Sequence, residues 1–197
     1  HFLSTRSGSA QIWSINPAGG EAVQMTHAPL DIGSFEHAPA LQRMVVTMEV
    51  YPGLTPEETV AHDEEKAADP RTGMIYDELM FRHWDVWEDG KRSHLFFLSG
   101  RDLDRLPVDL MPDLDADVPT RPWGGMEEVA VAPDGSEVLF TAKILPGSEP
   151  AWSTDYDLYA VPTGVPAPPR CLTESNRAWD TQPLYSPDGK TLAWLAM

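Results

Sequence analysis

Apolar and polar residues alternate in short runs along the chain, and two of these runs share one pattern. Residues 132–142 read APDGSEVLFTA and residues 186–196 read SPDGKTLAWLA, and the two align without a gap at an offset of 54. In each copy Pro fixes φ for a turn and Gly accepts a positive φ, and strand-type residues follow. The pattern predicts two β-hairpins with turns at 133–135 and 187–189.

Further runs extend this hairpin to a unit of four strands. DYDLYAVP at 155–162 and PRCLT at 169–173 supply a third and a fourth strand, and QIWSINPAGGEAVQMT at 11–26 repeats this second half. A copy without the Asp-Gly turn begins with APALQRMVVTMEV at 38–50, and SHLFFLSG at 93–100 and PVDLM at 107–111 complete it.

Four-stranded units of about 40–50 residues are typical of propeller blades. The sequence therefore predicts an all-β fold: a partial β-propeller of about three four-stranded antiparallel blades with a short helical insertion. Residues 1–197 would form part of one domain. Its parts would be a half blade at 1–26, a blade at 35–111, a blade at 126–173 and a half blade at 182–197. The alternative is a β-sandwich, but sandwiches do not repeat a Pro-Asp-Gly turn in register.

The predicted insertion, residues 51–80, departs from the strand pattern. Thr55 is placed as N-cap, Pro56 at the first helical position and Glu58 for a capping box. The spacing predicts a helix from about Pro56 to Ala68 that ends before Asp69-Pro70. Insertions of this kind often carry binding functions.

Composition narrows the range of partners. The chain has 31 acidic against 14 Lys and Arg residues, a formal charge of −17, which repels phosphate backbones and anionic lipid. No apolar run reaches the length of about 18 residues that a membrane span requires. Neither nucleic acid nor membrane is an expected partner, and the compartment stays open between periplasm and cytoplasm. The one cysteine, Cys171, allows no disulfide within the chain.

The ordered set of longer stretches resembles the prolyl oligopeptidase family of serine peptidases, in its dipeptidyl peptidase V and acylaminoacyl peptidase-like branch. The stretches include FLSTRSGSAQIWSI, IYDELMFRHWDVWEDGKRSHLFF, LMPDLDADVPTRPWGGMEEVAVAPDG and NRAWDTQPLYSPDGKTLAWLAM. The resemblance implies an amino-terminal propeller that caps a carboxy-terminal α/β-hydrolase domain. That enzyme would release short peptides or acylated residues from peptide amino termini.

Catalysis in that family uses a Ser nucleophile on a Gly-x-Ser-x-Gly elbow, with a His base and an Asp. No such elbow occurs in the 197 residues. No catalytic residue and no cofactor is therefore predicted on this chain, and we expect it to be a piece of a longer one.

Four residues are candidates for substrate binding. Glu127 and Glu128 follow WGGM and precede a predicted innermost strand. The family resemblance implies that a carboxylate binds the free ammonium group of a peptide substrate. The alternative for this pair is two solvated glutamates. Trp84 and Asp85 lie in RHWDVWEDG and could line a peptide cleft. In the alternative, the tryptophans fill space between insertion and blade while Arg82 pairs with Asp85.

No metal site is predicted. Helical spacing would direct His62, Asp63, Glu64 and Glu65 to different faces, and DLDADVP at 113–119 lacks the Gly and terminal Glu of an EF-hand.

The favoured function is a substrate-gating and positioning propeller of a serine exopeptidase, with peptide substrates and a carboxy-terminal α/β-hydrolase domain as partners. The alternative is a non-catalytic TolB-type propeller that mediates protein–protein contacts. Because each predicted half blade lacks strands, self-association of the chain is also expected.

Overall fold

The computed structural model describes residues 1–38, 43–99, 107–163 and 167–197. Residues 39–42 of the predicted repeat copy at 38–50, and Gly100 of the predicted strand 93–100, lie outside these ranges. The described chain is mostly β-structure in open antiparallel sheets, with one α-helix within the described ranges. The all-β class is therefore confirmed, while the propeller stays a prediction.

The described residues form four main sheets that follow one another along the chain, and a small two-stranded sheet that is described below. The first sheet contains β1 (Phe2–Ser4), β2 (Gln11–Ser14) and β3 (Val23–Gln24). The second contains β4 (Phe35–Ala38), β5 (Arg43–Val50), β8 (Arg92–Ser99) and β9 (Val108–Asp109). The third contains β10 (Val129–Val131), β11 (Glu137–Ala142), β12 (Asp157–Pro162) and β13 (Arg170–Cys171). The fourth contains β14 (Asp180–Tyr185) and β15 (Leu192–Ala196).

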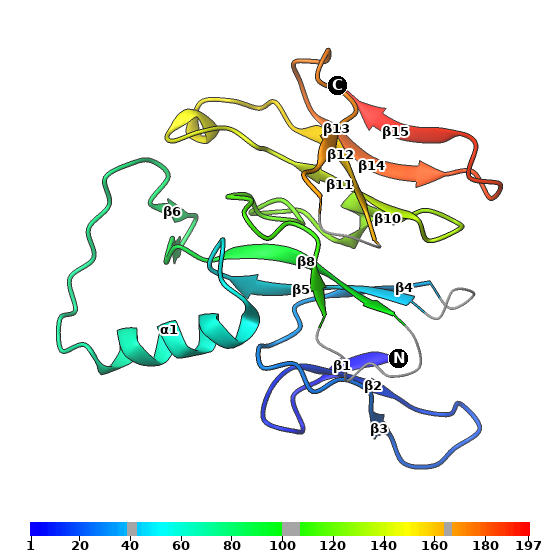
Figure 1. The fold of residues 1–197 in the computed structure, drawn as a ribbon, viewed down its shortest axis with the longest axis horizontal. Helices are drawn as coiled ribbons and strands as arrows, with labels where there is room; N and C mark the ends of the chain where they lie inside the picture. Colours follow the sequence, from blue (N-terminus) through cyan, green and yellow to red (C-terminus); the bar gives the residue numbers. More distant parts are fainter. Residues whose placement is uncertain (39–42, 100–106, 164–166) are drawn as a thin grey trace.

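The sheets lie one above another in chain order, from β1–β3 near the N-terminus to β14–β15 near the C-terminus (Figure 1). Strands in the second and third sheets are each paired in simple sequence order, as in a meander. The two sheets thus repeat one topology, which is what the four-strand repeat in the sequence predicts.

Both faces of the second sheet are buried, which explains the nearly continuous apolar sequence of β5 and β8. Met44, Val46 and Phe96 pack toward the first sheet, in a cluster with Ile12. The alternate positions, including Val45, pack toward the third sheet in a cluster with Val138, Phe140 and Val161. Because successive side chains of a strand point to opposite faces, a strand buried on both sides is apolar throughout.

The two Pro-Asp-Gly turns form as predicted. Gly135 donates its N–H to Ala132 O over 2.7 Å, and Gly189 donates to Ser186 O over 2.8 Å. The two glycines have φ of 71° and 70°, a conformation that glycine adopts at little cost. The β10–β11 and β14–β15 hairpins follow.

The predicted helix is also confirmed, as α1 (Pro56–Ala68). Thr55 Oγ1 accepts from Glu58 N, and Glu58 Oε2 accepts from Thr55 N, so both halves of the capping box are present. Tyr51 donates to Asp63 over 2.9 Å, and Lys91 Nζ lies 3.1 Å from the same carboxylate. These contacts tie α1 to the two ends of the segment that carries it.

The segment between β5 and β8 covers residues 51–91, so it extends beyond the predicted 51–80. The additional part contains a small hairpin, β6 (Arg82–His83) and β7 (Val86–Trp87), which is a separate two-stranded sheet. We call residues 51–91 the insertion. In the described residues, no helix is long and apolar enough to cross a bilayer.

Candidate functional site

The turn that leads into β10 is built around two glycines that leave room for two glutamates. Gly124 donates its N–H to Thr120 O over 2.7 Å, and a one-turn 3-10 helix, Met126–Glu128, follows. A Cβ on Gly124 would lie 2.5 Å from both the N and the O of Thr120, and it would also meet the Glu128 carboxylate. Only glycine fits this approach of backbone to backbone.

Glu128 faces inward from this turn and is buried. Its Oε2 accepts from Thr120 N over 2.7 Å, and its Oε1 accepts from Thr120 Oγ1 over 2.9 Å. Burial raises the pKa of Glu128, and the two hydrogen bonds from Thr120 oppose part of that rise. Both oxygens of this carboxylate therefore hold the turn together.

Glu127, in contrast to Glu128, is exposed. Its carboxylate folds back over Gly125, where a Cβ would collide with it. Of the two predicted acidic residues, Glu127 is thus the one that solvent and a ligand can reach.

Trp84 and Asp85 form the two-residue loop of the β6–β7 hairpin, and both are exposed. Trp84 and Trp87 are 76% and 56% exposed, so they do not fill space between insertion and sheet. Arg82 lies over the Trp87 ring at 6.0 Å, and in the described part of the chain no ion pair joins it to Asp85. The alternative of packed tryptophans with an Arg82–Asp85 pair is therefore wrong.

Trp123 connects the two sets of predicted residues. The Trp84 and Trp123 ring centroids are 5.7 Å apart, with an interplanar angle of 72°. Trp123 immediately precedes the Gly124–Gly125 turn, so the tip of the insertion lies beside the turn that carries Glu127. The structure thus brings Trp84 and Asp85 near the predicted glutamate pair.

A pocket of about 310 Å³ opens next to this contact. Three connecting segments line it: the end of the insertion, residues 115–122, and residues 143–156 between β11 and β12. The charged lining residues are Glu78, Glu88, Arg92, Asp115, Asp117, Arg121 and Lys143.

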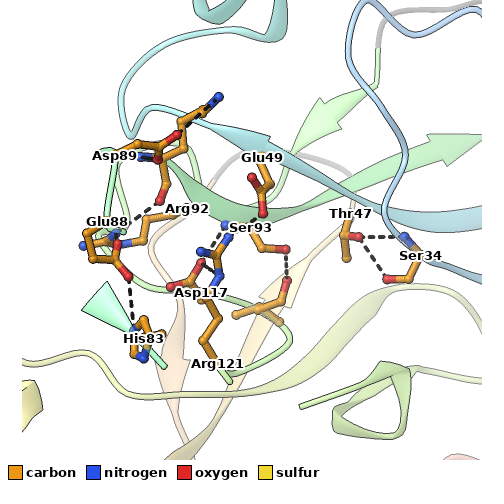
Figure 2. A network of polar contacts seen from close by, with 12 residues as sticks. Ser34, Thr47, Glu49, His83, Glu88, Asp89, Arg92, Ser93, Asp117 and Arg121 are labelled. Carbon is orange, nitrogen blue, oxygen red and sulfur yellow. Dashed lines mark hydrogen bonds and ion pairs between the residues drawn. The ribbon is translucent and has the colours of Figure 1, made fainter. Parts of the chain in front are cut away.

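On one wall of the pocket, the basic residues pair with acidic neighbours (Figure 2). Arg92 contacts Glu88 at 2.6 Å and Asp115 at 2.7 Å, and His83 lies 3.2 Å from the other oxygen of Glu88. This chain of contacts fastens the β6–β7 hairpin to the start of β8.

Asp117 and Arg121 form a second group of polar contacts in the pocket lining. Asp117 accepts from Ser93 N over 2.9 Å and lies 3.0 Å from Arg121 Nε, and Arg121 also pairs with Glu49 (Figure 2). Burial raises the pKa of Asp117, and the Arg121 guanidinium offsets part of this effect. These residues link the connection after β9 to the end of β5.

Lys143 lines the pocket from the segment between β11 and β12. Its Nζ donates to Ser153 O over 2.5 Å and to Pro150 O over 3.1 Å, and it lies 4.3 Å from the Tyr156 ring centroid. Burial lowers the pKa of this amine. The two carbonyls and the Tyr156 ring thus fix the position of the Lys143 side chain. These contacts hold the 143–156 segment in place.

Sequence reasoning missed Trp123, Arg121 and Lys143. Trp123 stands in the WGGM stretch, directly before two glycines, and this position is a signal that the sequence does contain. No local pattern marks Arg121 or Lys143, because their partners lie on other segments.

No protein-family model matches the chain. Dipeptidyl-peptidase 5 of Porphyromonas endodontalis is 29% identical over 202 residues, which covers 100% of this chain and 28% of that protein. Dipeptidyl-peptidase 5 of Porphyromonas gingivalis is 29% identical, with coverage of 100% and 28%. Dipeptidyl-peptidase 4 of Giardia intestinalis is 28% identical, with coverage of 96% and 29%.

These relatives support a dipeptidyl peptidase family. The chain spans less than a third of the length of these relatives.

Proposed function

We propose that this chain is part of a β-propeller that positions peptide substrates for a serine exopeptidase, whose catalytic α/β-hydrolase domain is not on this chain. The relatives named dipeptidyl peptidases support the enzyme class. The repeated four-stranded meanders, packed face to face through apolar clusters, support the propeller.

The observation that carries the positioning role is that Glu128 is buried and hydrogen-bonded while the neighbouring Glu127 is exposed. Glu128 satisfies the Thr120 backbone and hydroxyl, which fixes the turn, and Glu127 is left exposed on that fixed turn. An exposed carboxylate on a fixed backbone can bind the ammonium group of a peptide amino terminus through a charge-assisted hydrogen bond. We assign this role to Glu127.

The adjoining pocket supports the same role, because three different connections line it. Loops from successive sheets that gather on one side can restrict which substrates reach a neighbouring domain. In this proposal, the pocket and the insertion limit access to short peptides.

The test compares a peptide with a free amino terminus and the same peptide acetylated at that terminus. NMR titration or calorimetry on the 197-residue chain should show tighter binding of the free peptide. Glu127→Gln should remove most of that preference. Glu57→Gln, an exposed acid on α1, is the matched control and should leave it unchanged.

Equal binding of the two peptides to the unmodified chain would contradict the role of Glu127. It would favour the alternative of a propeller that only mediates protein–protein contacts.

A further inference from the structure

Two tryptophans from separate segments form an aromatic corner on the surface. The corner consists of Trp84, from the β6–β7 loop, and Trp123, from the turn before β10. Their rings meet at 72° with centroids 5.7 Å apart. Trp84 is 76% and Trp123 75% exposed, so most of both indoles faces solvent. Large aromatic side chains placed in this way contribute little burial to the fold.

The backbone at Trp84 is strained. Its φ is 51°, in a two-residue hairpin loop where glycine or asparagine is usual. A bulky residue with positive φ is a genuine outlier and is often found at functional sites. Burial does not compensate for this strain, because the side chain is exposed. The strain therefore indicates that the Trp84 indole serves to bind a ligand and not to stabilise the fold.

The charges around the corner favour a cation. The insertion holds eleven acidic and four basic residues. Asp85 follows Trp84, and the Glu127 carboxylate lies over Gly125, two residues beyond Trp123.

The basic residues closest in sequence to the two tryptophans already have partners. Arg82 lies over Trp87, and Arg121 pairs with Asp117 and Glu49. Among the described residues, no cation lies over the Trp84 or Trp123 ring, so their exposed indole surface is open to a positively charged ligand.

We propose that Trp84 and Trp123 form a cation–π site that receives a basic side chain, arginine or lysine, of a bound polypeptide. A guanidinium or ammonium group over an indole face is attracted by the ring quadrupole, and indole is the strongest of the aromatic side chains in this respect. The inference rests on the proposed function in taking a peptide as ligand. It adds a preference for a basic residue near the bound amino terminus.

The test uses peptides that lack the free amino terminus proposed to bind Glu127. One probe is an acetylated and amidated tripeptide with a central arginine, and the second probe carries norleucine in that place. Because the amino terminus is blocked, the result does not depend on whether Glu127 binds a peptide ammonium group. Changes in the indole N–H signals of Trp84 and Trp123 report on the site, assigned with Trp84→Phe and Trp123→Phe.

We expect the arginine peptide to bind at least 5-fold more tightly than the norleucine peptide. Trp84→Asn and Trp123→Ala should each reduce the affinity for the arginine peptide at least 5-fold. Trp152→Ala is the control, because Trp152 is 79% exposed but does not belong to the corner. It should bind both peptides like the unchanged chain.

Trp84→Asn also separates binding from folding. Asparagine accepts a positive φ better than tryptophan does, so this variant should melt at the same or a higher temperature. Equal affinity for the two peptides, or unchanged arginine binding in Trp84→Asn, would overturn the proposal.

Discussion

The hydroxyl of Tyr185 on β14 donates a hydrogen bond of 2.7 Å to the Glu137 carboxylate on β11. This bond joins the fourth sheet to the third. Burial, together with the neighbouring Glu137, raises the pKa of the phenol, so the hydroxyl keeps its proton and remains a donor.

Tyr185→Phe should therefore lower the free energy of unfolding by about 1 kcal/mol, the usual net contribution of one hydrogen bond. Urea unfolding measures the loss. Tyr156→Phe is a suitable control, because the Tyr156 hydroxyl makes no hydrogen bond within the described residues and its ring would still stack on Trp179. Equal losses in the two variants would show that the bond between Tyr185 and Glu137 contributes nothing.

Glu128 should make stability depend on pH. Its pKa in the folded state is raised above the ordinary 4.5 by burial. The folded state thus binds this proton more tightly than the unfolded state does. The resulting stabilisation is fully present below pH 4.5 and is lost as the pH rises through the folded-state pKa.

Glu128→Gln removes this titration and keeps one side-chain oxygen as an acceptor for Thr120. Relative to the unchanged chain, the variant should gain stability as the pH is raised from about 4 to 7. Urea unfolding at several pH values measures the difference. A difference that stays constant with pH, or that moves the other way, would contradict the buried position of Glu128.

Gly124 should not tolerate a side chain. Its Cβ would lie 2.5 Å from the Thr120 backbone, which cannot move without breaking the turn. Gly124→Ala should reduce stability by about 1–3 kcal/mol, as overpacking does. It should also weaken binding of peptides with a free amino terminus, because the turn fixes Glu127.

The matched control is Gly73→Ala, since a Cβ at Gly73 meets nothing within 4 Å. Thermal unfolding should leave this variant close to the unchanged chain. A Gly124→Ala protein as stable as the control would mean that the turn can open without cost.

The fourth sheet exposes an apolar surface that should promote self-association. Leu184 is 68%, Leu195 59% and Trp194 43% exposed. Exposed apolar side chains next to a free strand edge favour contact with other chains. Light scattering should show a mass that increases with protein concentration, and Leu184→Lys with Leu195→Lys should reduce the increase. A monomer at every concentration would contradict this expectation.

Local signals predicted the parts of the fold that depend on neighbouring residues. Thr55 and Glu58 stand three positions apart, and their capping box fixes the start of α1. The Pro-Asp-Gly turns likewise need only adjacent residues and their flanking strands. The β6–β7 hairpin was missed because two-residue strands with exposed side chains leave no alternating pattern.

The site depended on contacts that the sequence does not show. The sequence alone does not distinguish Glu127 from Glu128. Only the position of Thr120 in the folded chain decides which of the two is buried. The contact of Trp84 with Trp123, and the pairing of Arg121 with Glu49, join segments that are distant in the chain. Their positions follow from how the second and third sheets pack.

The length of the insertion has a consequence for the order of folding. Strands β5 and β8 pair from Arg43 with Ser99 to Val50 with Arg92, although residues 51–91 separate them. Strands β10 and β11 are joined by residues 132–136 alone. Closing the longer loop costs about 2 kcal/mol more in chain entropy. We therefore expect the β10–β11 hairpin to form first and the centre of the second sheet to form late, after α1 has shortened the segment between its strands.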